Sequence, residues 1–437
     1  MCVDNSWDDE ERGRKLHQTV CLFMDRSRNR PLNIILFFFR LPQSSGLQNV
    51  IETLIHNSRR WETFTISPWS AITPHPAFQS VKNTLTSLRG LYVLDGVDGS
   101  TVIQDLGHTP ALQTLHVDFT RFPTAEVQAL FATQLKRVHI HLSAGDTPVS
   151  ARQLASLCTS IQRLDLKIWE GQLADEAPYH GSSIAGELEH LQLDLDSYPS
   201  SLFLDAITAP RLSSVDLNSF GLIQNSLGPV LHLPWDPHLF LSFIRRSSCS
   251  ITSLSLLNFT LGSDQQAAQF FSCMPAVRSL TIIEREIPRR MLPTEGLADA
   301  RWSNITQTTS LLLQKLCVRG HGELVEEVVG DIAQGGELSS SSASTQGPLL
   351  PSLVDFRLEI SGKNLNRTNT DTLMKIVASR WITDADDRAR AGLAKSLLSV
   401  DIKSSDGRGS IPESLTSQLK NLSDVGLEVF IRYVEDN

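Results

Sequence analysis

The sequence of 437 residues lacks the features that mark a membrane or secreted protein. Its longest apolar run, Ile34 to Phe39, is far shorter than the roughly 18 to 20 residues of a bilayer-spanning helix. Residues 1–14 are acidic and polar, whereas a signal peptide would be basic and then apolar. We therefore expect no membrane partner and a cytoplasmic or nuclear location.

Cysteine pairs, basic runs and catalytic signatures are also missing. The six cysteines have no C-x-x-C spacing, so they predict neither a zinc site nor a disulfide framework and suit a reducing compartment. The net charge is −9, and no run of Lys and Arg is long enough to follow a phosphate backbone, so we expect no nucleic-acid partner. The G-x-S-x-G, P-loop, H-E-x-x-H and dinucleotide signatures do not occur, and the sequence predicts neither an enzyme nor a cofactor.

What the sequence does contain is a six-residue phrase, apolar-x-x-apolar-x-apolar, that recurs between Trp61 and Ile402. The first six steps between fourth positions are 27, 24, 23, 26, 27 and 24 residues, within the roughly 20 to 29 of a leucine-rich repeat. Later steps of 39, 26, 36, 40 and 44 residues indicate insertions. The fourth positions are Phe64, Leu91, Leu115, Val138, Leu164, Leu191, Val215, Leu254, Leu280, Leu316, Phe356 and Val400.

A repeat of this kind buries its apolar strand face only by stacking on its neighbours. We therefore predict an α/β fold, an irregular leucine-rich-repeat solenoid or horseshoe with a parallel concave sheet and helices on the convex side. Such a solenoid escapes the usual single-core limit of about 250 to 300 residues. The predicted organisation is a polar segment and capping helix over residues 1–30 and one solenoid over 31–437. The Ser-rich stretch at 335–347 is predicted to be a disordered loop.

Helices and strands can be placed along this framework. Residues 7–28 predict an amphipathic helix with apolar Leu16, Val20, Leu22 and Phe23, followed by a strand at Leu32–Phe37. Gly426–Tyr433 predicts a closing strand. Further helices are predicted at Thr124–Thr133, Ala151–Cys158, Pro237–Arg246 and Asp264–Cys273.

The third, fifth and seventh positions of each phrase are predicted to line the concave face, because side chains alternate along a strand. Adjacent strands lie about 4.8 Å apart, which makes His116, His139 and Asp165 lateral neighbours. We interpret this dense polar patch as a partner-binding surface. Its residues are His116, Asp118, Arg137, His139, His141, Arg163, Asp165, Lys167, His190 and Asp194.

Two other interpretations of this patch stay open. The first is an ordinary solvated sheet face with mixed charges. The second is a metal-binding or enzymatic site that uses His116, His139, His141, Asp118 and Asp165. A metal would need three or four ligands in fixed geometry with a second shell, and nothing in the strand spacing holds these side chains to ligand distances. We therefore predict no metal here.

A set of short phrases extends over nearly the whole chain, in the segments Phe23–Ser27, Pro31–Ile34, Ser58–Trp61, Leu233–Trp235, Phe240–Ser247, Leu373–Trp381 and Gly426–Val429. These phrases resemble F-box proteins with divergent leucine-rich repeats from mushroom-forming fungi. In that family the F-box docks on the small adaptor of a cullin-RING ubiquitin ligase, and the repeats hold the protein to be ubiquitinated. The resemblance implies a protein-interaction scaffold with an unknown protein ligand on the concave face.

The chain departs from the family pattern at its N-terminus. An F-box is a compact helical segment, and only residues 1–30 precede the first predicted strand. We expect the ligase adaptor to bind only if an F-box lies upstream. Otherwise the chain is a repeat-only relative or a non-functional truncated family member.

Overall fold

The computed structural model describes most of the strand and helix residues predicted above. The described residues are 10–37, 45–71, 73, 75–94, 98–119, 125–142, 149–168, 173–174, 182–194, 198–218, 224–225, 228–229, 237–259, 264–284, 313, 316, 349–360, 367–381, 386, 388, 393, 395–404, 411–424 and 426–433. The predicted disordered loop at 335–347 lies outside them.

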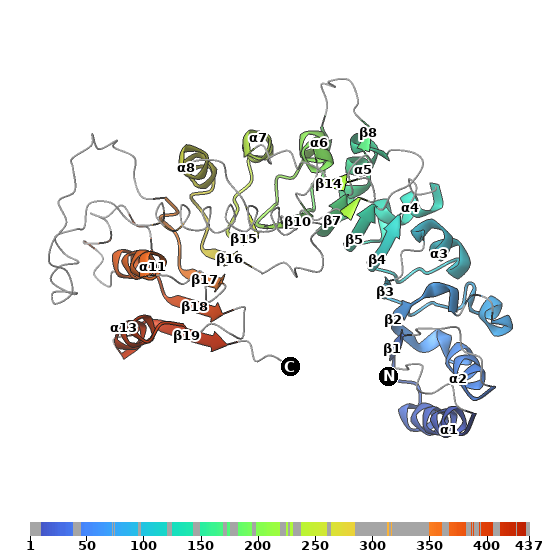
Figure 1. The fold of residues 1–437 in the computed structure, drawn as a ribbon. Helices are drawn as coiled ribbons and strands as arrows, with labels where there is room; N and C mark the ends of the chain where they lie inside the picture. The colour runs from blue at the N-terminus through green and yellow to red at the C-terminus, as the bar shows by residue number, and fades with distance from the viewer. Residues whose placement is uncertain are drawn as a thin grey trace. The chain divides into compact units, whose positions relative to one another are not determined.

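Thirteen strands form one sheet in which spatial order follows chain order (Figure 1). The predicted α/β fold with a parallel sheet is confirmed, because the neighbouring strands with a defined register run parallel. In order, the strands are β1 (Leu32–Phe37), β2 (Trp61–Ser67), β3 (Gly90–Val93), β4 (Thr114–Phe119), β5 (Arg137–Leu142), β7 (Arg163–Ile168), β10 (His190–Asp194), β12 (Ser214–Asn218), β15 (Ser253–Leu257), β16 (Ser279–Ile283), β17 (Asp355–Ile360), β18 (Ser399–Ser404) and β19 (Glu428–Tyr433).

Helices connect many of these strands, as parallel pairing requires a crossover between consecutive strands. The four helices predicted between strands are confirmed to within one residue at each end. The helices are α1 (Glu10–Ser27), α2 (Ser45–His56), α3 (Gly99–Leu106), α4 (Ala125–Thr133), α5 (Ala151–Leu157), α6 (Tyr198–Ala206), α7 (Pro237–Ser247), α8 (Asp264–Ser272), α11 (Arg367–Arg380) and α13 (Glu413–Asp424).

Shorter elements complete the described chain. Turns of 3₁₀ helix stand beside or in place of some crossover helices, and three pairs of two-residue strands lie outside the large sheet. The 3₁₀ turns are η2 (Ser58–Arg60), η3 (Trp69–Ala71), η4 (Pro76–Val81) and η5 (Cys158–Ser160). The small strand pairs are β6 (Val149–Ser150) with β8 (Leu173–Ala174), β9 (Ser183–Ile184) with β11 (Ile207–Thr208), and β13 (Gln224–Asn225) with β14 (Gly228–Pro229).

The chain divides into two compact units. The first comprises residues 1–191 and 202–209, and the second comprises residues 192–201 and 210–437. In the first unit, helices α2 to α4 lie on one side of strands β1 to β5, and in the second unit α7, α8, α11 and α13 lie on one side of β15 to β19 (Figure 1). None of the helices in the described ranges is long and apolar enough to cross a membrane.

The core of each unit is a row of apolar side chains that runs across the strands. In the first unit Phe64 pairs with Leu91, Leu91 with Leu115, and Leu115 with Val138. All four side chains are buried. The second unit repeats the arrangement, so the predicted alignment of fourth positions is confirmed for Val215, Leu254, Leu280, Phe356 and Val400.

The strand predicted around Leu316 is wrong. Leu313 and Leu316 are helical and fully buried, and β16 pairs directly with β17 so that Leu280 lies opposite Phe356. Apolar residues three positions apart suit one face of a helix as well as the ends of the strand phrase. The local pattern was therefore too short to separate the two structures.

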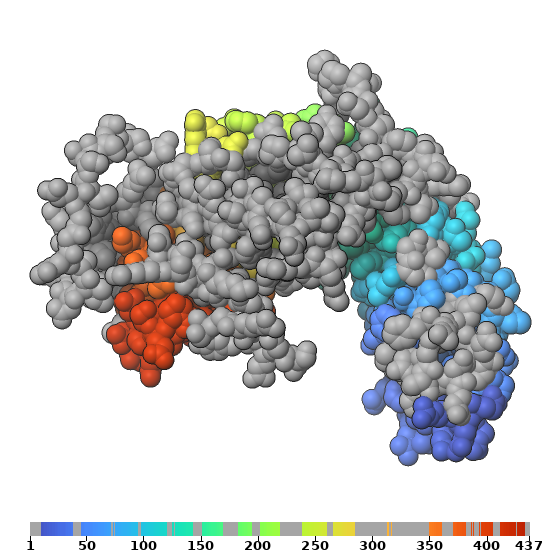
Figure 2. Space-filling view, in the orientation of Figure 1, coloured from blue at the N-terminus to red at the C-terminus, as the bar shows by residue number. Residues whose placement is uncertain are grey.

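The predicted N-terminal helix forms, but its buried face is narrower than the sequence suggests. Gly13, Leu16, Val20 and Met24 are buried, at the spacing of one helical stripe. Leu22 and Phe23, which the sequence analysis counted among the apolar positions of this helix, are 50% and 60% exposed. In the space-filling view α1, in dark blue, lies at the surface at one end of the first unit (Figure 2).

Helix α1 packs against α2 through two glycines. A Cβ atom added to Gly46 would lie 2.5 Å from the carbonyl carbon of Gly13 and 2.7 Å from the backbone nitrogen of Arg14. Such distances cannot be relieved by a side-chain rotation, because the opposing atoms belong to the backbone. The two helices can therefore approach this closely only while position 46 has no side chain.

We expect Gly46→Ala to destabilise the chain by about 1–3 kcal/mol, the usual cost of overpacking. Alanine normally stabilises a helix relative to glycine by up to about 1 kcal/mol. A loss of stability in Gly46→Ala would therefore indicate the steric clash between the two helices. Urea unfolding measures the effect. Gly186→Ala is the matched control, because a Cβ there meets nothing within 4 Å. Equal unfolding midpoints for the two variants would contradict the close helix packing.

Arg380, at the end of α11, joins three segments of the second unit. Its side chain is 1% exposed. Nε donates to the carbonyl oxygen of Leu316 at 2.7 Å, Nη1 donates to that of Leu350 at 2.8 Å, and Nη2 donates to that of Leu349. The guanidinium therefore joins the end of α11 to the helical residue Leu316 and to the backbone at Leu349 and Leu350.

We expect Arg380→Met to lower the free energy of unfolding by at least about 3 kcal/mol, because each buried acceptor left without a donor costs about 1–3 kcal/mol. Arg380→Lys should restore only part of this loss, since an ammonium group lacks the planar fork of donors. The exposed Arg278 provides the control variant Arg278→Met. Unchanged urea midpoints for Arg380→Met would show that these bonds contribute nothing to stability.

Candidate functional site

Ionisable side chains gather on β4, β5, β7 and the start of β10, all within the first unit. Along β4, β5 and β7 the fourth and sixth positions are buried, and the third, fifth and seventh point to the other side of the sheet. His116 lies opposite His139, and His139 lies opposite Asp165. We call His116, Asp118, His139, His141, Asp165 and His190 the histidine–aspartate cluster.

Asp165 occupies the centre of the cluster. The Arg163 Nε atom donates to Asp165 Oδ1 at 3.2 Å. The Nδ1 atom of His139 lies 3.9 Å from Oδ2, and the Nε2 atom of His190 lies 3.9 Å from Oδ1. Burial by itself raises the pKa of Asp165, but the neighbouring His139 and the Arg163 guanidinium more than offset it and hold the pKa below its usual range. Asp165 is therefore a fixed negative charge that three side chains approach.

Asp118 and His141 form a second, closer pair. The Nδ1 atom of His141 lies 3.1 Å from Asp118 Oδ1 across the β4–β5 ladder. The side chain of His141 is 20% exposed and that of Asp118 is 18% exposed. The carboxylate therefore fixes the orientation of this imidazole ring and leaves one edge of the pair accessible from the sheet face.

His116 and His139 stack on each other between these two carboxylates. Their ring centroids are 3.8 Å apart, with 31° between the ring planes. The ring of Tyr92, one strand earlier, lies 6.2 Å from His116. Burial, together with the adjacent His139, lowers the pKa of His116 from 6.5 to about 4, although Asp118 and Asp165 act in the opposite direction. The stack therefore carries a neutral imidazole at physiological pH.

The remaining predicted residues differ in their accessibility. Arg137 and Lys167 are exposed on the same face, and Arg137 lies opposite Arg163. His190 contributes to the cluster through Asp165. Asp194, the last residue of β10, is only 8% exposed and belongs to the second unit. Its place in a partner-binding surface stays a prediction.

Tyr92 was not among the residues predicted for the partner-binding surface. Tyr92 is the fifth position of the phrase whose fourth position is Leu91, so the alternation of side chains along the strand would also have placed it in the patch.

A second group of residues that was not predicted is an ion-pair network on strands β17 to β19 of the second unit. Arg357 Nη2 lies 3.6 Å from Glu359 Oε2, Lys403 Nζ lies 3.4 Å from the same oxygen, and Arg432 Nη2 lies 3.1 Å from Asp401 Oδ2.

The cluster can recognise a polar or charged group through hydrogen bonds and charge. Neutral imidazoles offer one donor and one acceptor each, and the arginines offer forked donors. Within the described ranges, no group of three or more His, Cys, Asp or Glu side chains is placed so that it could hold a metal ion. The geometry of His116, His139 and Asp165 is that of a stacked and ion-paired row.

Comparison with known proteins gives no assignment for this chain. No protein-family model matches it, and no curated protein is significantly similar to it. A functional proposal for this chain therefore rests on its fold and its surface residues.

We expect the NMR titration of His116 to have a midpoint near pH 4. Because the folded-state pKa lies below the unfolded value of 6.5, the stability contributed by neutral His116 is complete above pH 6.5. It is lost progressively as the pH falls toward 4, so His116→Gln should flatten this part of the stability profile. His139→Ala should raise the midpoint of His116, because it removes a neighbour that lowers this pKa and opens the ring to water. A midpoint near 6.5 in the intact chain would contradict the stacked geometry.

Proposed function

We propose that this chain is a protein-interaction scaffold and that its sheet is the concave face of an irregular leucine-rich-repeat solenoid. Support comes from the order of the sheet, in which spatial neighbours are sequence neighbours and the fourth positions on paired strands lie opposite one another and are buried. A repeat array buries its apolar strand face in this way. In this proposal, the side chains on the opposite face of the sheet form the recognition surface.

The observation that carries the binding role is the histidine–aspartate cluster with its exposed arginines. Protein interfaces favour arginine and aromatic side chains, and polar groups on a rigid sheet meet a partner with little loss of side-chain freedom. The ion-pair network at β17 to β19 is a second charged part of the sheet. There the side chains of Glu359 and Asp401 are 4% and 14% exposed and face cations from their own and adjacent strands.

The proposed class is a relative of the substrate-recognition region of fungal F-box ubiquitin-ligase receptors. Support comes from the phrases that resemble this group, two of which coincide with helices: Phe240–Ser247 lies in α7, and most of Leu373–Trp381 lies in α11. In this proposal the chain holds a partner protein and catalyses no reaction itself. Adaptor recruitment would require an F-box segment joined to it.

Reversal of the exposed charges tests the proposed surface. We expect Arg137→Glu/Arg163→Glu to reduce capture of specific partners from an extract of the source cells by at least tenfold, about 1.4 kcal/mol in binding free energy. Quantitative mass spectrometry of proteins retained by the immobilised full chain provides the measurement. An unchanged urea midpoint for the variant verifies that it is folded.

The matched control is Arg59→Glu/Lys82→Glu, which makes the same charge change at exposed residues of the first unit outside the sheet strands. It should retain the partners of the unaltered chain. If both double variants capture the same proteins in the same amounts as the unaltered chain, the sheet face is not the recognition surface. If both lose partners equally, the effect is one of net charge and the proposed site is also wrong.

A further inference from the structure

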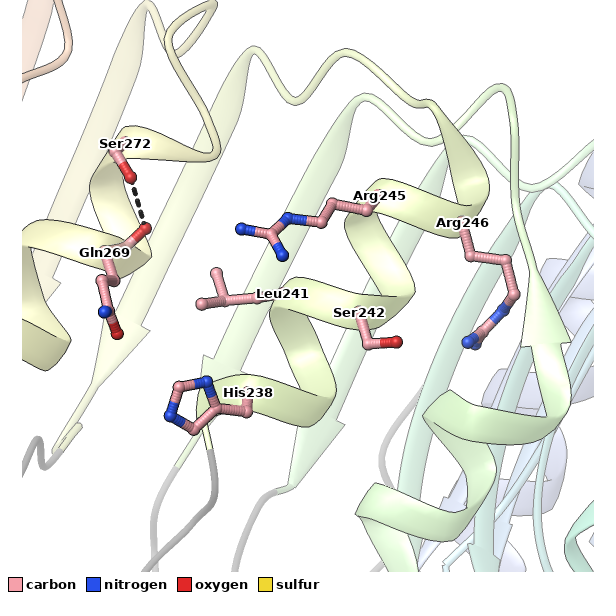
Figure 3. Close-up of a pocket in the computed structure, with 7 residues that line it drawn as sticks. All are labelled: His238, Leu241, Ser242, Arg245, Arg246, Gln269 and Ser272. Atoms are coloured by element: carbon pink, nitrogen blue, oxygen red, sulfur yellow. Dashed lines mark hydrogen bonds between the residues drawn. The ribbon is translucent and has the colours of Figure 1, made fainter. Parts of the chain in front are cut away.

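A cleft lies beside helices α7 and α8, entirely within the second unit (Figure 3). Its volume is about 760 Å³, within the range of roughly 300 to 1,000 Å³ that is usual for ligand sites. The residues that line it include His238, Leu241, Arg245 and Arg246 on α7, and Gln269 and Ser272 on α8.

The periodicity of α7 explains why these side chains line the cleft. His238, Leu241 and Arg245 are three and four residues apart, so they share one side of the helix. Figure 3 shows the Arg245 guanidinium extending from α7 toward α8, with Leu241 between it and His238 along the helix. Across seven residues of helix, the two polar ends of this stripe are separated by roughly 10 Å.

Aromatic side chains pack α7 against α8. On the buried side of α7, Phe240 lies near Phe243 and Phe270, with ring centroids 6.1 and 5.5 Å apart. Phe270 in turn lies near Phe259 and Phe271, at 5.3 and 5.5 Å. These buried rings connect the two helices that carry the side chains of the cleft.

The charge of the lining is of one sign. Arg245 and Arg246 carry permanent positive charges, and the described residues of the lining include no Asp or Glu, although the whole chain has a net charge of −9. Arginines in the last turn of a helix also complement the helix dipole. An interaction with the helix dipole does not require a cleft beside the arginines. It also does not explain why Gln269 and Ser272 of α8 line the same cleft.

We propose that this cleft binds an acidic peptide segment. A carboxylate pairs with the exposed Arg245, and Gln269 offers amide hydrogen bonds to the peptide backbone. A small inorganic anion would occupy only a minor part of about 760 Å³, which favours a ligand of several residues. The site is separate from the sheet face of the first unit and extends the proposed function by a second, charge-selective contact.

Retention of the full chain on two pooled peptide libraries tests this proposal. The first library has the form X-X-Glu-Leu-Glu-X-X, and the second replaces both glutamates with glutamine. We expect at least tenfold stronger retention on the acidic library. Arg245→Gln should abolish the difference, whereas Arg278→Gln, which removes the same charge from an exposed residue of the same unit, should leave it intact.

Each other outcome overturns the proposal. Equal retention on both libraries would show that acidic peptides are not selected. Retention that persists in Arg245→Gln would place the contact elsewhere, and loss in both arginine variants would reduce it to general charge attraction. Displacement by millimolar inorganic phosphate would assign the cleft to small anions. The variant Arg137→Glu/Arg163→Glu should retain the acidic library normally, so failure here is distinguishable from failure of the sheet-face proposal.

Discussion

Lateral alignment of apolar side chains across parallel strands is the constraint on which the rest of the structure depends. Leu115 can be buried only if Leu91 and Val138 lie opposite it, because a single strand offers no core of its own. A shift of one residue would turn each buried side chain to the opposite face. The same register that builds the core therefore also places His116, His139 and Asp165 in one row.

The sequence could predict this row because it follows from two regularities, the alternation of strand side chains and the repeat of the phrase. Both regularities can be read directly from a single sequence. The helices α4, α5, α7 and α8 were predictable for a related reason, since each fills the crossover that two parallel strands require. No comparable rule gives the burial of a side chain at a strand end, and Asp194, which is only 8% exposed, is an example.

The errors share one physical cause, which is that burial depends on tertiary neighbours. Leu316 has the spacing of the strand phrase, but it is buried in a helical segment to which Arg380 donates a hydrogen bond. Phe23 is apolar and helical, yet Gly13 and Gly46 set a close crossing that leaves it outside the contact. The stacked geometry of His116 and His139 was equally beyond the sequence, because side-chain rotation is not encoded in periodicity.

The coincidence of spatial and chain order also determines how such a chain can change its length. The connection between β16 and β17, residues 284–354, is about four times as long as residues 120–136 between β4 and β5, yet both strand pairs keep an unbroken register. Loop closure grows only with the logarithm of length, so this difference costs roughly 1 kcal/mol. New segments can therefore enter between strands at little thermodynamic cost, and variation in the connections can proceed while the row of core side chains stays the same.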